Sequence, residues 1–81
     1  MKIEDFEKAV QEVCPNKSEK VITRFKFDYG CVTFGLTKKK IKETLFYVNH
    51  IFKLGKNEDY IPENYQYRLT SEEINQILNK L

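Results

Sequence analysis

The sequence predicts an α+β domain, a small two-layer α/β sandwich in the order α-β-β-α-β-α, with a β-hairpin and a third strand packed by helices. Three observations predict it. Apolar residues recur at helical spacing near the start, in the middle and at the end of the chain, residues 21–37 alternate between apolar and polar, and helix-capping residues precede two of the helical segments. With 81 residues and no linker-like segment, the whole chain, 1–81, is expected to form a single globular domain.

The first element is predicted to be a helix over about residues 2–14. Its apolar residues share one helical face at Ile3, Phe6, Val10 and Val13. Several acids follow its start, where the helix dipole favours negative charge. Pro15 should end the helix, because the residue before a proline is disfavoured in the α conformation.

Residues 21–28 and 31–37 predict a β-hairpin closed by a turn at Tyr29-Gly30. Pairing across this turn places Phe27 opposite Val32 and Phe25 opposite Phe34. One face of the hairpin is then almost entirely apolar and the other mostly polar. Such a division is expected of a sheet that covers a core on one side.

The second half of the chain predicts two helices and a strand. Thr37 can cap a helix over about residues 38–54 that Gly55 closes, and a buried stripe on it is formed by Ile41, Leu45, Val48 and Phe52. Residues 65–70 alternate and predict a third strand. Thr70 and Glu73 then form a capping box that opens a short C-terminal helix.

Charge is distributed very unevenly along the chain. Residues 1–16 carry a net −2, residues 17–56 a net +7 and residues 57–81 a net −3, so that the overall +2 conceals a strongly basic middle. This asymmetry indicates an electrostatically guided partner rather than a particular fold.

The basic middle contains the candidate binding residues. On the helix over 38–54, one exposed sector should carry Lys39, Lys42, Phe46, His50 and Lys53, and Lys38 belongs to the basic run at the start of this helix. Arg24 and Lys26 could extend this surface from the polar face of the hairpin, and Tyr60 could add a separate contact from an acidic loop. Phe46 has two interpretations: core packing, which is the commoner fate of a phenylalanine, or an exposed anchor for a partner.

Catalytic and metal-binding functions find little support in the residue inventory. The single histidine, His50, and two cysteines, Cys14 and Cys31, show no spacing typical of a metal site. A nucleophilic pair of Cys31 and His50 would require a convergence that the sequence does not imply. We therefore expect no enzyme activity, no metal and no cofactor.

The leading functional hypothesis is a small intracellular, non-enzymatic binding protein. The N-terminus lacks the apolar core of a signal peptide, and two unpaired cysteines suit a cytoplasmic location. A lysine- and asparagine-rich composition is typical of AT-rich genomes, including phages and mobile elements. An inhibitor or adaptor that occupies a macromolecular partner, such as a nucleic-acid-processing or defence enzyme, would fit these features.

Two alternatives stay open. A nucleic-acid-binding regulator could use the same basic face, although only two of the fourteen basic residues are arginine. A self-assembling structural protein could associate through a free sheet edge.

Overall fold

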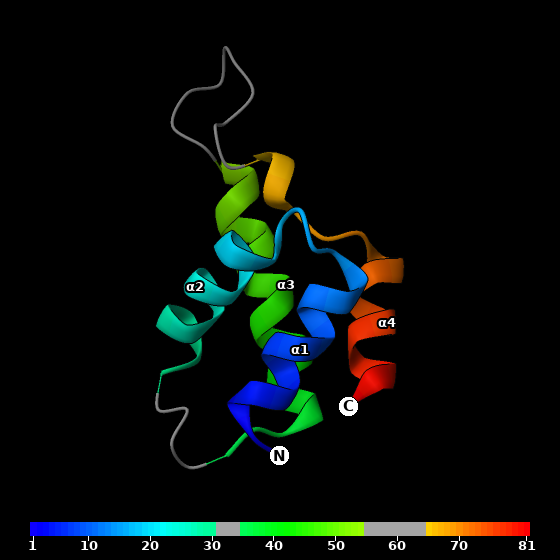
Figure 1. The fold of residues 1–81 in the computed structure, drawn as a ribbon. Coiled ribbons are helices and arrows are strands. Elements are labelled where there is room, and N and C mark those ends of the chain that lie inside the picture. The colour runs from blue at the N-terminus through cyan, green and yellow to red at the C-terminus, as the bar shows by residue number, and fades with distance from the viewer. Residues whose placement is uncertain (31–34, 55–64) are drawn as a thin grey trace.

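The computed structural model describes residues 1–30, 35–54 and 65–81, and the elements in these ranges are all helical (Figure 1). The helices are α1 (Ile3–Val13), α2 (Ser18–Tyr29), α3 (Lys38–Leu54), the single-turn 3₁₀ helix η2 (Tyr65–Tyr67) and α4 (Ser71–Lys80). The described residues contain no β-strand, so the predicted α+β sandwich is wrong.

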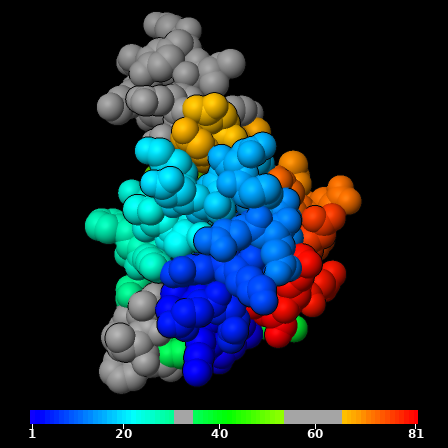
Figure 2. All heavy atoms as spheres, viewed as in Figure 1, coloured from blue at the N-terminus to red at the C-terminus, as the bar shows by residue number. Residues whose placement is uncertain are grey.

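The four α-helices form a bundle in which α1 and α3 lie diagonally opposite each other. α1 packs mainly against α2 and α4, and α3 packs against the same two helices and against η2. Figure 2 shows α1, α2 and α4 on the near surface, where little of α3 is visible, and Figure 1 shows the ribbon of α3 passing behind α1. This diagonal relation places α1 and α3 on opposite sides of the molecule.

The predicted hairpin is wrong because residues 21–28 belong to α2. The buried residues of this helix recur at helical spacing, at Val21, Ile22, Phe25 and Tyr29. Gly30, at φ 87°, ends the helix instead of forming a hairpin turn. Of the second predicted strand, residues 31–34 lie outside the described residues and residues 35–37 lead into α3 without strand pairing.

A stack of aromatic rings joins α1 to α2. The rings of Phe6 and Phe25 are 4.0 Å apart between centroids, and Phe25 also contacts Tyr29 at 5.1 Å. Both phenylalanines are completely buried. The alternation of Val21, Phe25 and Phe27 suits a strand, but the helix aligns Phe25 with Phe6 and leaves only Phe27 outside the core.

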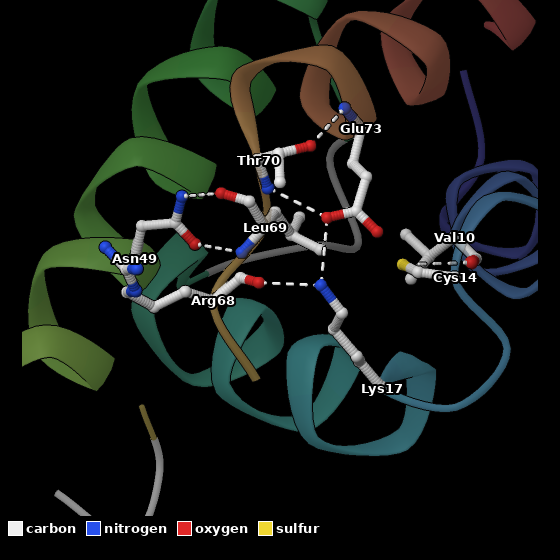
Figure 3. A network of polar contacts seen from close by, with 8 residues as sticks. All are labelled: Val10, Cys14, Lys17, Asn49, Arg68, Leu69, Thr70 and Glu73. Atoms are coloured by element: carbon white, nitrogen blue, oxygen red, sulfur yellow. Dashed lines mark hydrogen bonds and ion pairs between the residues drawn. The ribbon is translucent and has the colours of Figure 1, made fainter. Parts of the chain in front are cut away.

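The third predicted strand is also wrong, although Leu69 in this segment is buried. Residues 65–67 form η2, and the extended segment after it pairs with a side chain rather than with a strand (Figure 3). The Leu69 N–H donates to Asn49 Oδ1 at 2.8 Å, and Asn49 Nδ2 donates to the Leu69 carbonyl at 2.7 Å. The Asn49 amide thus satisfies both backbone groups of a buried residue, as a neighbouring strand would.

A second polar cluster fixes the start of α4 to the chain just before α2 (Figure 3). Lys17 Nζ donates to the Arg68 carbonyl at 2.8 Å and to Glu73 Oε1 at 2.9 Å. The same carboxylate oxygen accepts the Thr70 N–H at 2.8 Å, and Glu73 N–H donates to Thr70 Oγ1 at 3.0 Å. The predicted capping box is confirmed, and it is extended by an ion pair between distant parts of the chain.

The positions of three predicted helices are confirmed to within a residue or two. α1 covers the predicted first helix, α3 has the predicted bounds, and α4 begins directly after the Thr70 cap. In the part of the chain that the structure describes, no helix is long and apolar enough to cross a membrane.

Asn49→Ala should lower the free energy of unfolding by about 1–3 kcal/mol, because it leaves the buried N–H and carbonyl of Leu69 without their partner. Chemical denaturation monitored by circular dichroism measures this change. Asn75→Ala, at an exposed position of α4, is the matched control and should change stability little. Equal stability of the two variants would contradict a structural role for the Asn49 amide.

Stability should fall in acid partly through Glu73. Burial opposes ionisation of this carboxyl, but hydrogen bonds from Thr70 and Lys17 outweigh it and hold its pKa below the ordinary value of 4.5. Because the folded state favours the carboxylate, Glu73 adds to the free energy of unfolding above its ordinary pKa of 4.5. This stabilisation is lost as the pH falls through the lowered pKa of the folded state.

Glu73→Gln should therefore be less stable than the wild type at neutral pH and should lose less stability on acidification. Denaturation curves recorded between neutral pH and strong acid test this difference. Glu72→Gln, which alters an exposed neighbour on the same helix, should retain the acid dependence of the wild type. Identical acid profiles for Glu73→Gln and the wild type would rule out this role.

Candidate functional site

Helix α3 begins at a conventional cap followed by three consecutive lysines. Thr37 Oγ1 accepts the Lys40 N–H at 3.3 Å, and the Thr37 carbonyl accepts the Ile41 N–H at 2.9 Å, which confirms Thr37 as the predicted cap. Lys38, Lys39 and Lys40 follow immediately, and all three are exposed. Positive charge here opposes the helix dipole, so helix stability alone does not explain these residues.

The two sides of α3 differ sharply in exposure. Its inward stripe is buried and consists of Ile41, Thr44, Leu45, Val48 and Phe52. Its outward residues, which we call the α3 basic face, are all exposed and comprise Lys39, Lys42, Phe46, His50 and Lys53. Phe46 is 48% exposed, so the interpretation that it packs in the core is wrong.

Ion pairing separates the lysines of α3 from four basic residues elsewhere, although Lys2, Lys8 and Lys20 also form no ion pair among the described residues. Four cations outside α3 form ion pairs: Lys17 with Glu73, Arg24 with Asp28, Lys26 with Glu7, and Lys80 with Glu12. Within the described residues, no lysine of α3 takes part in an ion pair. The lysines of this face are therefore exposed, charged and not neutralised by the carboxylates of the described residues.

The structure does not bring all the predicted binding residues together. Arg24 and Lys26 lie on α2 rather than on a hairpin face, and each is held by a carboxylate at 2.8 Å and 2.6 Å respectively. Lys38 is exposed at the first turn of α3, beside the α3 basic face. Tyr60 lies outside the described residues.

Acidic residues concentrate on the helix opposite the α3 basic face. α1 contains four acids against one lysine: Glu4, Asp5, Glu7 and Glu12 against Lys8. α1 and α3 are diagonal in the bundle, and the segments that precede them are joined by hydrogen bonds between Met1 and Leu36. Among the described residues, the ion pairs of the α1 carboxylates are formed with Lys26 and Lys80 and not with a lysine of α3.

The residues considered for catalysis or metal binding remain separate. Cys14 is buried, its Sγ–H donates to the Val10 carbonyl at 3.4 Å, and burial together with the charge of Glu73 raises the pKa of the thiol. A raised pKa disfavours the reactive thiolate. His50 is exposed on α3, Cys31 lies outside the described residues, and among residues 1–30, 35–54 and 65–81 no cluster of three potential metal ligands forms.

Sequence reasoning missed two exposed aromatic residues. Phe27 on α2 is 76% exposed and Tyr47 on α3 is 51% exposed. The predicted hairpin places Phe27 on its apolar face, and only the helical period of α2 shows that it points outward. A signal for this exposure is present in the spacing, since Phe27 does not fit the helical series of Val21, Ile22, Phe25 and Tyr29.

Comparison with protein-family models, with curated proteins and with solved structures finds no match for this chain, so its function must be inferred from the site itself.

Proposed function

We propose that this protein is a non-enzymatic binding protein that occupies an acidic surface of a macromolecular partner through the α3 basic face. It would act as an inhibitor or adaptor by covering that surface. The observation that carries this proposal is the concentration on one helix of exposed lysines that no carboxylate of the described residues pairs with: Lys38, Lys39, Lys40, Lys42 and Lys53. Lys2, Lys8 and Lys20 also form no ion pair among these residues, but they are spread over other parts of the chain.

The composition of the α3 basic face suits a protein partner. Lysines at its margins would speed association with an acidic surface and would contribute selectivity more than affinity. Phe46, half-exposed among them, supplies apolar area that could be buried in a pocket of the partner. A cytoplasmic location forms part of the proposal, and the free thiol of Cys14 is compatible with a reducing compartment.

Nucleic acid is the second candidate, and the diagonal arrangement of α1 and α3 favours it. Carboxylates near a basic surface would repel phosphate, but α1, which carries most of the N-terminal acids, is the helix diagonal to α3. The scarcity of arginine, two of fourteen basic residues, keeps this candidate second, because arginine forms the bidentate contacts typical of phosphate and base recognition.

The double variant Lys39→Glu/Lys42→Glu should lose most partner binding while it remains folded. Both residues are exposed near the start of α3, where negative charge is favourable to the helix, so the fold should be retained. Immobilised wild-type and variant proteins can be compared for the proteins that each captures from lysate of the source cells. Proteins retained by the wild type should be depleted on the variant by at least about tenfold, a loss of roughly 1.4 kcal/mol in binding.

Lys2→Glu/Lys8→Glu is the matched control, since it makes the same change in charge at exposed positions beside and on α1. It should capture the same proteins as the wild type. Equal capture by all three proteins would contradict the proposal. Titration with duplex and single-stranded DNA and RNA at about 50 and 200 mM salt tests the second candidate, which requires affinity that falls steeply with salt.

A further inference from the structure

Phe27 is the most exposed large apolar side chain of the described residues, and its position has no structural explanation. It is 76% exposed on α2 and lies outside the buried cluster. Truncating it would therefore open no cavity in the core. An exposed aromatic residue that violates the helical pattern is more informative about function than about folding.

Phe27 borders a cleft of about 260 Å³ between α2 and the C-terminal part of α3. Its lining consists of Lys20, Thr23, Arg24, Phe27 and Phe52. Phe52 is 4% exposed and provides an apolar floor, whereas Lys20 and Arg24 are the only ionisable residues among the described ones that line the cleft. The cleft therefore combines aromatic walls with positive charge.

The guanidinium of Arg24 is held in a defined place beside this cleft. Its Nε donates to Asp28 Oδ2 at 2.8 Å, and its Cζ lies 4.9 Å from the centroid of the Phe27 ring. Because Nε is used by Asp28, the terminal amino groups of Arg24 are left to bind a second carboxylate. Lys20 lies 5.8 Å from the Tyr67 ring and provides a second cation at the same cleft.

We propose that this cleft binds one apolar side chain of an acidic peptide segment of the partner protein. The apolar side chain would lie between Phe27 and Phe52, and neighbouring carboxylates would bind Arg24 and Lys20. Charge complementarity favours the acidic segment, because both ionisable residues in the described lining are positive. Lys20 forms no ion pair among the described residues, and Arg24 is paired with Asp28 through Nε alone. This choice of occupant depends on the proposed function in one respect, namely that the partner is a protein.

The dimensions of the cleft favour a single side chain. Its volume is smaller than the roughly 300–1,000 Å³ of a typical small-molecule pocket. Single-stranded nucleic acid usually requires a basic groove that follows several phosphates and successive aromatic platforms. Among its described residues this cleft offers one exposed ring, and Arg24 already lies against that ring.

Selection of random twelve-residue peptides displayed on phage, against the immobilised full-length protein, tests this proposal and does not require that the partner be identified. Enriched peptides should contain a large apolar residue flanked by Asp or Glu. Phe27→Ala should weaken binding of the synthesised peptides by at least tenfold, measured by fluorescence anisotropy. Arg24→Gln should weaken it as well, and more for peptides with more carboxylates.

Phe46→Ala is the matched control, because it removes the exposed phenylalanine of the α3 basic face and leaves the cleft intact. Circular dichroism should show that both phenylalanine variants remain folded. The proposal is overturned if no acidic peptides are enriched, or if the enriched peptides bind Phe27→Ala as tightly as the wild type. It is also overturned if the wild type binds a labelled oligothymidylate and Phe27→Ala abolishes that binding, because the cleft would then be a site for nucleic acid.

The outcome for the cleft can be separated from the outcome for the α3 basic face. Lys39→Glu/Lys42→Glu leaves the lining of the cleft unchanged, so this variant should still bind the selected peptides. Peptide binding that depends on Phe27, together with unaltered capture by the α3 variant, would confirm the cleft and contradict the proposed role of α3. Peptide binding that does not depend on Phe27, together with reduced capture by the α3 variant, would contradict the cleft and support the proposed role of α3.

Discussion

The bidentate contact between Asn49 and Leu69 is the constraint on which the rest of this small bundle depends. The chain must pass from η2 to α4 through a buried position, and a buried backbone without partners would be costly. The Asn49 side chain supplies both partners from α3, and Lys17 and Glu73 bind the adjoining backbone (Figure 3). α4 is thereby held where Ile74 and Ile77 can complete the core formed by the other helices.

The parts of the fold that follow local chemistry could be predicted from the sequence. Thr37, together with Thr70 and Glu73, indicates the starts of α3 and α4 because a cap requires only residues close to it in the chain. Residues 21–28 are ambiguous locally, since Val21, Phe25 and Phe27 follow a period of two whereas Val21, Ile22 and Phe25 follow a helical series. The stack of Phe25 on Phe6 of α1 favours the helix, and such a long-range contact is not visible in the sequence pattern of either segment.

The candidate site, like the fold, could be predicted only in part from the sequence. Exposure of Lys39, Lys42 and Lys53 followed from the helical period of α3, which the structure confirms. The pairing of Arg24 and Lys26 with carboxylates was not predictable, because it depends on the replacement of the hairpin by α2 and on how α2 packs beside α1. The exposure of Phe27 was missed for the same reason, and the cleft it borders exists only once α2 and α3 are packed together.

Because α1 is acidic and α3 is basic, their diagonal placement in the bundle contributes an electric dipole directed from α1 toward α3. A dipole experiences a torque in the field of a charged surface, so the molecule should turn before it makes contact. The α3 side would lead toward negative surfaces and the α1 side toward positive ones. Encounters with a charged partner would then begin in a restricted set of orientations, most strongly at low ionic strength where the field extends furthest.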